Sequence, residues 1–525
     1  MVPVLTAAEV ARRIPDGATI AFPGNLSIMV ADHLLQAIET RFLETGTPRG
    51  LTVFEPCNAA NGEGTGIERF AHPGMTRRVI ASAFPMFKPT RITDLILAGT
   101  VEGYNFPMGV LYSLAREIGA GRPGVLTEVG LGTFIDPEQT GGQLHPARTE
   151  ELVERIRLGG RDLLFYKSFP IDVTLLKATT ADRDGNLSIE NEPLSLGILS
   201  LVIAAKASGG RVYVQVERLV DAGAVEPKRV AVPGAFVDGV VLAPDAPQSG
   251  LSRYDPTVTG QARATLGRDP VQVGAQRVIL ARAAASLAPG WLVNLGVGIP
   301  NALPQLLRET GCEDLVGIST EHGAIGGLPN PPPAFGSHVN PSAILDPTDT
   351  FNFYTGGVLD ATFLGLAQAD RAGNVNVTKF GGRVMGVGGF VDITARTKRI
   401  FICGTLAAGR FEIAVADGAV SVVREGDVPK LVESVEQITL NGQLALDRGQ
   451  EVTMITERGA FRLGRDGWTL VEVAPGIVPE RDIAPMLRFA LQVAPNLRPY
   501  AAEIVAPPSA VVSAWLRRTI EARGR

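Results

Sequence analysis

A six-residue pattern occurs twice in this chain, and it limits the possible folds more than any other feature. The first copy is Ala181-Asp-Arg-Asp-Gly-Asn186 and the second is Ala369-Asp-Arg-Ala-Gly-Asn374. Each copy follows an apolar run and precedes a short extended segment, and its glycine supplies the positive φ that a hairpin turn needs. We therefore predict two related α/β halves; the alternative is that a common turn has arisen twice.

A second pair of segments supports the same division. Asp16-Gly17 precedes a strand-like run and a loop that contains Gly24, whereas Pro289-Gly290 precedes a strand-like run and Gly296-Val-Gly298. Apolar β-rich runs alternate with helical stretches throughout, which is typical of α/β layers. The fold class is therefore predicted to be α/β.

The length of 525 residues is too great for one ordinary domain. From about Ala243 to Pro270 the sequence is irregular and polar, and periodicity returns near Val271. We therefore expect an N-terminal domain over residues 1–245, a linker over 246–270 and a C-terminal domain over 271–525.

Local patterns predict individual elements. Thr6-Ala-Ala-Glu9 fits a capping box that opens a helix ending near Arg13, and Gly311 fits the position just after a helix. Longer helices are expected over 28–41, 107–118, 275–287 and 301–309. Strands are expected over 18–22, 51–54, 78–81, 171–176, 211–216, 291–295, 314–320 and 399–403.

Charge and composition exclude several classes of protein. The chain has 49 basic and 54 acidic residues and a net charge of −5, which argues against a nucleic-acid partner. No apolar run reaches the ~20 residues of a membrane helix, and the chain does not begin like a signal peptide. The three cysteines lie far apart and the five histidines show no metal-ligand spacing. We expect a cytoplasmic protein with no membrane partner, no metal site and no bound cofactor.

Glycine is frequent, with 60 residues in 525, and in the second half it is concentrated in three loops. The first loop, residues 294–301, lies between an expected strand and helix, where its amides could bind an anion or a carbonyl. Its Gly-x-Gly spacing lacks the third glycine of a dinucleotide-binding fingerprint. The third loop, residues 381–390, could serve as an oxyanion hole. A tight turn and a flexible connection without a ligand are the alternatives.

The second glycine-rich loop, residues 319–329, contains Glu321 at the end of an apolar run. Ligands of open α/β sheets bind beyond the carboxyl ends of the strands, so Glu321 is a candidate catalytic residue; a solvated loop glutamate is the alternative. His322 could act as a general base, although adjacent side chains usually point apart. The sequence lacks a Gly-x-Ser-x-Gly elbow and a Walker A loop, which disfavours serine hydrolases and NTPases.

Motifs that occur in order along nearly the whole chain carry a family resemblance. They include Tyr104-Asn-Phe-Pro107, Gly185-Asn186, Asn294-Leu-Gly-Val-Gly298, Thr320-Glu-His-Gly323, Phe351-Asn-Phe-Tyr354 and Gly388-Gly389-Phe390. With these motifs the sequence resembles the class I coenzyme A (CoA) transferases, specifically the single-chain acetate/propionate (short-chain acyl-CoA) type. The resemblance implies two similar open α/β domains of the NagB/RpiA-like kind and a homo-oligomer.

The resemblance also implies a reaction. Glu321 would attack an acyl-CoA and become a glutamyl-CoA thioester, so that CoA passes between short-chain carboxylic acids in a ping-pong reaction. Acyl-CoA and carboxylates would be the partners, with CoA a transiently covalent substrate rather than a cofactor. The backbone at Gly296, Val297 and Gly298, and at Gly388 and Gly389, would contact the thioester oxygen or the pantetheine arm.

Two loops depart from the pattern of the family. Residues 22–27 read Phe-Pro-Gly-Asn-Leu-Ser where paired glycines are usual, and His322 and Ala324 stand where a Gly-Pro pair is common. Because these loops are expected to line the acyl pocket, the departures concern the acyl and acceptor specificity and leave the reaction class unchanged. The alternatives are an acyl-CoA hydrolase that uses the same glutamate, and a non-catalytic ligand-sensing module on this fold.

Overall fold

A parallel β-sheet forms the centre of the N-terminal half. The computed structural model describes residues 1–60, 62–85, 90–145 and 150–524. Seven parallel strands of the first sheet follow the order β11-β10-β8-β1-β2-β3-β4, and β9 pairs with β8. The strands are β1 Thr19–Ala21, β2 Leu51–Glu55, β3 Thr76–Ala81, β4 Glu102–Asn105, β8 Val173–Asp182, β9 Leu187–Ser188, β10 Arg211–Val220 and β11 Gly239–Leu242.

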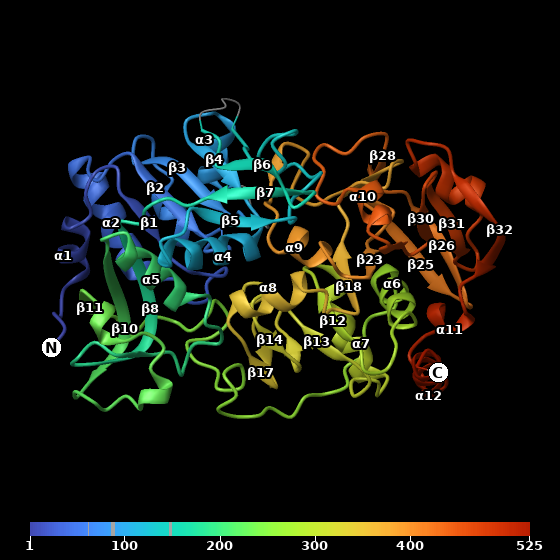
Figure 1. Cartoon of the computed structure of the whole chain (residues 1–525). Coiled ribbons are helices and arrows are strands. Elements are labelled where there is room, and N and C mark those ends of the chain that lie inside the picture. Colours follow the sequence, from blue (N-terminus) through green and yellow to red (C-terminus); the bar gives the residue numbers. More distant parts are fainter. Residues whose placement is uncertain (61, 86–89, 146–149, 525) are drawn as a thin grey trace.

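A second, larger sheet forms the centre of the C-terminal half (Figure 1). Its order is β17-β14-β13-β12-β18-β23-β29-β30-β31-β32. The strands are β12 Leu292–Leu295, β13 Gly317–Ser319, β14 Ala324–Ile325, β17 Ala343–Ile344, β18 Ala361–Gly365, β23 Arg399–Cys403, β29 Glu451–Ile455, β30 Gly459–Gly464, β31 Gly467–Val473 and β32 Gln492–Pro499. The parallel run β29-β23-β18-β12-β13 matches β11-β10-β8-β1-β2 of the first sheet, so the prediction of two similar α/β halves is confirmed.

The repeated six-residue pattern forms the same hairpin in each half. The carboxylate of Asp182 accepts hydrogen bonds from the amide and the side chain of Asn186, each 2.9 Å long. Asp370 accepts the same pair of bonds from Asn374, at 3.0 and 3.1 Å. The first hairpin joins β8 to β9, and the second joins β19 (Gln368–Asp370) to β20 (Val375–Asn376).

Helices pack on the two large sheets, and several smaller sheets of two or three strands accompany them. The helices are α1 Ala7–Arg12, α2 Asp32–Thr45, α3 Arg91–Leu97, α4 Met108–Gly119, α5 Ile198–Ala207, α6 Ala275–Ala284, α7 Leu303–Glu309, α8 Pro347–Thr355, α9 Phe390–Thr394, α10 Gly442–Asp447, α11 Ala502–Val505 and α12 Ala510–Ala522. The small sheets contain β5 Gly124–Thr127, β6 Val153–Leu158, β7 Arg161–Lys167, β15 Leu328–Pro329, β16 His338–Val339, β21 Lys379–Phe380, β22 Arg383–Val384, β24 Ala407–Ala408, β25 Glu412–Ala416, β26 Ala419–Arg424, β27 Val428–Pro429 and β28 Leu431–Val432. None of the helices in the described residues is long and apolar enough to cross a lipid bilayer.

The local expectations are mostly confirmed, and the exceptions have identifiable causes. Thr6 and Glu9 form the predicted capping box, and Gly311 follows α7 with a φ of +67°. The helix predicted over 28–41 begins later, at the start of α2, because Met29 has a φ of +56° and lies in a tight turn. The strand predicted over 314–320 is shorter, because the residues before β13 form a turn in which the amide of Leu315 donates to the carbonyl of Cys312 at 3.1 Å. The helix predicted over 301–309 starts as a 3-10 turn and becomes α-helical only in α7.

The two halves meet along α4, which lies against α8 and α9 (Figure 1). Backbone hydrogen bonds cross this junction. The amide of Gly388 donates to the carbonyl of Ser82 at 2.8 Å, and the amide of Phe84 donates to the carbonyl of Met385 at 3.0 Å. Residues 243–274, all of them described, join β11 to α6 without a helix or strand. The predicted linker over 246–270 falls within this stretch.

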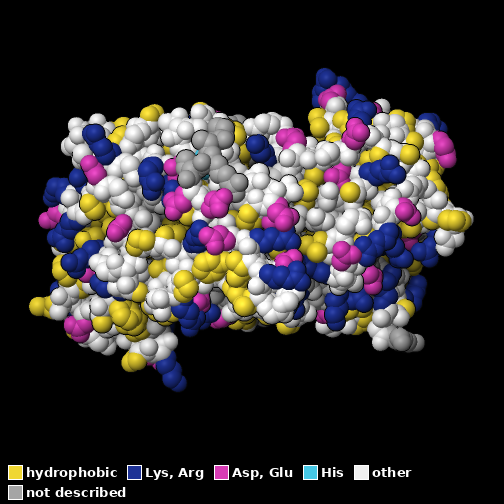
Figure 2. Space-filling view, turned by 45° about the horizontal axis from the view of Figure 1, so that its top comes forward, with side chains coloured by type: hydrophobic (Ala, Val, Ile, Leu, Met, Phe, Trp, Pro, Cys, Tyr) yellow, Lys and Arg dark blue, Asp and Glu magenta, His cyan; other side chains and the backbone are white. Residues whose placement is uncertain are grey.

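The exposed surface carries both signs of charge. On the face drawn in Figure 2, lysine and arginine side chains are interspersed with aspartates and glutamates over both halves. This distribution agrees with the small net charge of −5.

Candidate active site

A cavity of about 230 Å³ lies where the two halves meet. The N-terminal half contributes the loops after β1, β2 and β3 and the start of α4, and the C-terminal half contributes the loops after β12, β13 and β18 and the segment before α9. Most of the wall is apolar, and its largest side chains are Met108, Phe335, Phe380, Met385 and Phe390. The cavity is therefore built by segments far apart in the sequence.

Glu321 is the one carboxylate among the described residues that line this cavity. It follows β13 by two residues, so it lies at the carboxyl end of a parallel strand, where the sequence pattern placed it. The side chain is only 9% exposed, and Oε2 has no hydrogen-bond partner within the described chain. Burial raises its pKa to about 7, while hydrogen bonds from its own backbone and from Asn294 act in the opposite direction. Such a carboxylate is poorly solvated but still substantially ionised near neutral pH.

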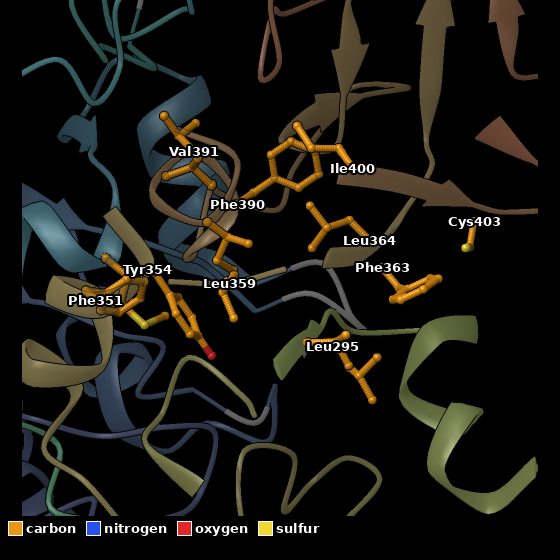
Figure 3. Close-up of a cluster of buried hydrophobic side chains, with 14 of the residues drawn as sticks. Leu295, Phe351, Tyr354, Leu359, Phe363, Leu364, Phe390, Val391, Ile400 and Cys403 are labelled. Carbon is orange, nitrogen blue, oxygen red and sulfur yellow. The ribbon is translucent and has the colours of Figure 1, made fainter. Parts of the chain in front are cut away.

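A row of polar side chains lies under Glu321, and sequence reasoning assigned it no function. Ser319, Asn294 and Thr362 are neighbours in register on β13, β12 and β18, and all three are fully buried. Tyr354 of α8 reaches this row with its hydroxyl group, 3.0 Å from Ser319 Oγ and 3.2 Å from Asn294 Nδ2. In Figure 3 the Tyr354 ring packs beside Phe351, and its hydroxyl oxygen lies at the edge of the apolar cluster. Asn294 and Tyr354 both lie in motifs noted in the sequence, but strand register was needed to bring them together.

The first and third glycine-rich loops reach the cavity. Gly296, Val297, Gly388 and Gly389 line it, whereas Gly298 is not among the lining residues. The amide of Gly296 already donates to Phe363, and that of Gly388 to Ser82. Among the described residues no partner is found for the amides of Val297 and Gly389. Of these four lining residues, Val297 and Gly389 therefore have the available amide donors, and their role in catalysis stays a prediction.

The other glycines of these loops serve the backbone instead of the cavity. Past Glu321, a Cβ on Gly323 would lie 2.0 Å from the Leu345 carbonyl oxygen, and one on Gly327 would lie 2.3 Å from that of Val339. These glycines let the chain pack closely on the strands that follow, and none between 323 and 327 lines the cavity. Gly381 and Gly382 form the exposed turn between β21 and β22. At these positions glycine therefore serves the close packing and turning of the backbone.

Comparison with known proteins places this site in a family. A family model described as "Coenzyme A transferase" matches residues 4–243. The chain is 36% identical over 505 residues to acetate CoA-transferase YdiF of Escherichia coli, with 95% of this chain and 94% of that protein covered. It is 40% identical over 512 residues to caffeate CoA-transferase of Acetobacterium woodii, with 95% and 96% covered.

The chain belongs to the coenzyme A transferase family. A crystal structure of YdiF from Escherichia coli, in a thioester complex with CoA, matches this fold with a TM-score of 0.90 and 35% identity over 97% of each chain. Like these relatives, the protein is an enzyme that transfers CoA between carboxylic acids.

The two unusual loops of this CoA-transferase meet at the cavity. Asn25 of the loop after β1 donates from Nδ2 to the carbonyl of Phe335 at 2.6 Å. The Phe335 ring packs edge-on against His322, with 5.5 Å between ring centroids, and both rings line the cavity. Burial lowers the pKa of His322 to about 3, so the imidazole is neutral and a poor general base. His322 thus forms part of the wall beside Glu321.

Proposed function

We propose that this CoA-transferase moves CoA between short-chain monocarboxylic acids in a ping-pong reaction through a glutamyl-CoA thioester on Glu321. One observation carries the proposal: Glu321 is the only carboxylate among the described residues of an otherwise apolar cavity, at the carboxyl end of β13. Covalent catalysis by a glutamate needs an ionised carboxylate with little bound water. Burial removes the water, and a pKa of about 7 still leaves a substantial fraction of Glu321 ionised near neutral pH.

The reaction has two half-reactions. An oxygen of the Glu321 carboxylate attacks the thioester carbonyl of an acyl-CoA, and the C–S bond breaks to give an acyl–glutamyl anhydride and CoA thiolate. The thiolate then attacks the glutamyl carbonyl, which leaves glutamyl-CoA and releases the first carboxylate. A second carboxylate reverses these steps and departs as the new acyl-CoA. No proton or electron is lost or gained, so neutral His322 is not needed as a base.

Backbone amides are the proposed donors to the developing oxyanion. Val297 and Gly389 lie at the cavity with unpartnered amides, so their N–H groups can donate to a thioester oxygen without first breaking a bond within the protein. Carboxylates are weak nucleophiles, and rigid donors of this kind supply much of the required rate. Gly296, Gly298 and Gly388 would shape the passage for the pantetheine arm.

The acyl group is proposed to be small and uncharged beyond its carboxylate. Apart from Glu321 and His322, the described lining residues carry no titratable side chain, so a second carboxylate on the substrate would be buried without a cation. An apolar acyl group instead gains from the Met108, Phe335 and Met385 side chains.

The covalent intermediate is the test. The protein is incubated with acetyl-CoA or butyryl-CoA without an acceptor acid, and its peptides are analysed by mass spectrometry. A CoA adduct is expected on the peptide that carries Glu321 and is expected to be lost in Glu321→Gln. An adduct on another residue, or full transfer by Glu321→Ala, would refute the proposal. A hydrolase would instead release CoA steadily without any acceptor, whereas a transferase stops after the first half-reaction, with CoA still bound to Glu321.

A further inference from the structure

Three polar side chains form a straight row across the second sheet. Asn294 on β12 is paired in register with Ser319 on β13 and with Thr362 on β18. Residues in register on neighbouring strands project from the same face of a sheet, so the three side chains are adjacent. All are fully buried, and buried polar groups are retained only where their hydrogen bonds are satisfied.

The hydrogen bonds of this row fix the orientation of the Asn294 amide. Thr362 Oγ1 donates to Asn294 Oδ1 at 3.0 Å, which leaves the NH₂ group of the amide on the side of Tyr354. Asn294 Nδ2 donates one hydrogen to the Tyr354 hydroxyl at 3.2 Å. Tyr354 in turn contacts Ser319 Oγ, which donates to the Val293 carbonyl at 3.2 Å. The second hydrogen on Nδ2 remains available.

The register of β12 and β13 brings Asn294 beside the strand end that carries Glu321, and the Asn294 side chain lowers the pKa of that carboxylate, as a nearby donor does. Glu321 lies two residues past Ser319, at the end of the strand next to β12. We propose that Asn294 is a positioning residue, which holds the Glu321 carboxylate at the cavity by donating to it and is itself oriented by Thr362 and Tyr354. The inference rests on the proposed role of Glu321 as the nucleophile.

The titratable groups around Glu321 supply no positive charge, so the Asn294 donor is important for the ionised carboxylate. Cys57 after β2, Tyr354 of α8 and Asp392 of α9 interact electrostatically with the carboxylate. All three are acids, and burial raises their pKa values: those of Cys57 and Tyr354 well above their usual range, and that of Asp392 to about 8. They are therefore protonated near neutral pH and provide no cation to Glu321. His322 is neutral as well, which leaves Asn294 as the side chain among the described residues that stabilises the ionised form.

The pH dependence of adduct formation tests this role. Loss of the donor destabilises the ionised carboxylate, so Asn294→Ala should move the acidic limb of the single-turnover rate upward by about one pH unit. The adduct is followed on the intact protein with butyryl-CoA from about pH 5.5 to about pH 9. At pH 6.5 the variant should be about tenfold slower, and most of this deficit should disappear at high pH. A purely structural defect would instead lower the rate equally at every pH.

Two milder variants keep the test independent of folding. Tyr354→Phe and Thr362→Val each remove one oxygen with little change in volume and release one end of the Asn294 amide. Each should shift the limb in the same direction by a smaller amount. In the Asn294→Ala background neither should add a further shift, because both act through the amide.

The outcomes separate this inference from the proposed function. If Asn294→Ala and both milder variants keep the wild-type acidic limb while adducts still form on Glu321, Asn294 has no positioning role and the function stands. If adducts fail to form on Glu321 in the wild-type protein, the proposed function itself falls. Both ideas are supported if Asn294→Ala shifts the acidic limb of the single-turnover rate upward and if adding Tyr354→Phe or Thr362→Val to that variant causes no further shift.

Discussion

The carboxylate of Asp392 accepts a hydrogen bond of 3.0 Å from the amide of Gly109, which lies 283 residues earlier in the chain. This bond caps the first turn of α4, whose own N-cap residue, Pro107, has no side-chain hydrogen bond to offer. The amide of Met108 donates to the carbonyl of Gly388 at 2.9 Å in the same turn. The first turn of α4 is therefore completed by the opposite half, and α9 begins directly after the glycines that line the cavity.

Removal of this cap should weaken the junction. Asp392→Ala leaves the Gly109 amide buried without a partner, which should lower the free energy of unfolding by about 1–3 kcal/mol. Asp392→Asn keeps an acceptor oxygen, so its free energy of unfolding should fall clearly less than that of Asp392→Ala. Urea unfolding of both variants against the wild type measures the difference. Equal losses in the two variants would show that the carboxylate oxygen is not the important group.

The rate of adduct formation should follow the ionisation of Glu321. Its pKa is raised to about 7, and the nucleophile is the deprotonated form, so the rate should rise with pH up to about 7 and level off above. Glu321→Asp retracts the carboxylate by one methylene and should slow the step about 10²-fold. Rapid-quench mass spectrometry across this pH range measures both effects. A flat profile below pH 7 would mean that a different group limits the reaction.

Two glycine-to-alanine variants separate backbone strain from close contact. Gly386 has a φ of +83°, and a Cβ there would lie 2.5 Å from Ala83 Cα across the junction. Gly381 has a φ of +57° and open space around it. Gly381→Ala should therefore lower the free energy of unfolding by only about 1–2 kcal/mol, from backbone strain. Gly386→Ala should lower it by about 1–3 kcal/mol more, from the close contact, and should also slow adduct formation. Thermal and urea unfolding, with the adduct rate, provide the comparison; similar losses would argue against the close contact.

The size of the acyl pocket should be set by Phe335. This ring is 5% exposed and stands against His322, so Phe335→Ala removes a wall of the cavity. We expect the ratio of kcat/KM for a branched or aromatic acid to that for acetate to rise about tenfold or more. Succinate should remain a poor acceptor in both proteins, because no lining cation in the described residues can pair with its second carboxylate. Efficient use of succinate by the wild type would contradict this view of the pocket.

The two hairpins of the repeat should respond alike to substitution. Asn186 Oδ1 accepts from the amide of Gly234 at 3.0 Å, and Asn374 Oδ1 accepts from that of Gly442 at 3.2 Å, in addition to the bonds to their aspartates. Asn186→Ala and Asn374→Ala should each lower stability by about 1–3 kcal/mol. Differential scanning calorimetry of both variants is the measurement. A large loss in only one of them would indicate that the equivalence is limited to the backbone.

Features fixed by neighbouring residues were predictable from the sequence. The hairpins at Asp182 and Asp370, the capping box at Thr6 and Glu9 and the glycine after α7 depend on contacts within a few residues, so a short pattern contains the whole cause. The place of Glu321 was predictable for a similar reason, because a strand followed by a polar residue locates the carboxyl edge of a parallel sheet.

Features that depend on distant segments were not predictable. Asn294 meets Ser319 and Thr362 only through the register of three strands, which no local pattern specifies. Gly323 lies in the glycine-rich loop of Glu321, and glycine gives the same sequence signal for close approach to a substrate and to another backbone. The engagement of the Gly388 amide by Ser82 likewise needed the docking of the two halves.

The stretch from 243 to 274 joins the two walls of the active-site cavity in one polypeptide. Assembly of the site is therefore unimolecular, and the effective concentration of one wall near the other does not depend on the concentration of the protein. Dilution of the protein cannot separate the Glu321 wall from the Asn25 wall. Proteolytic cleavage within this stretch would turn the same contacts into a bimolecular equilibrium, in which the fraction of complete sites depends on protein concentration.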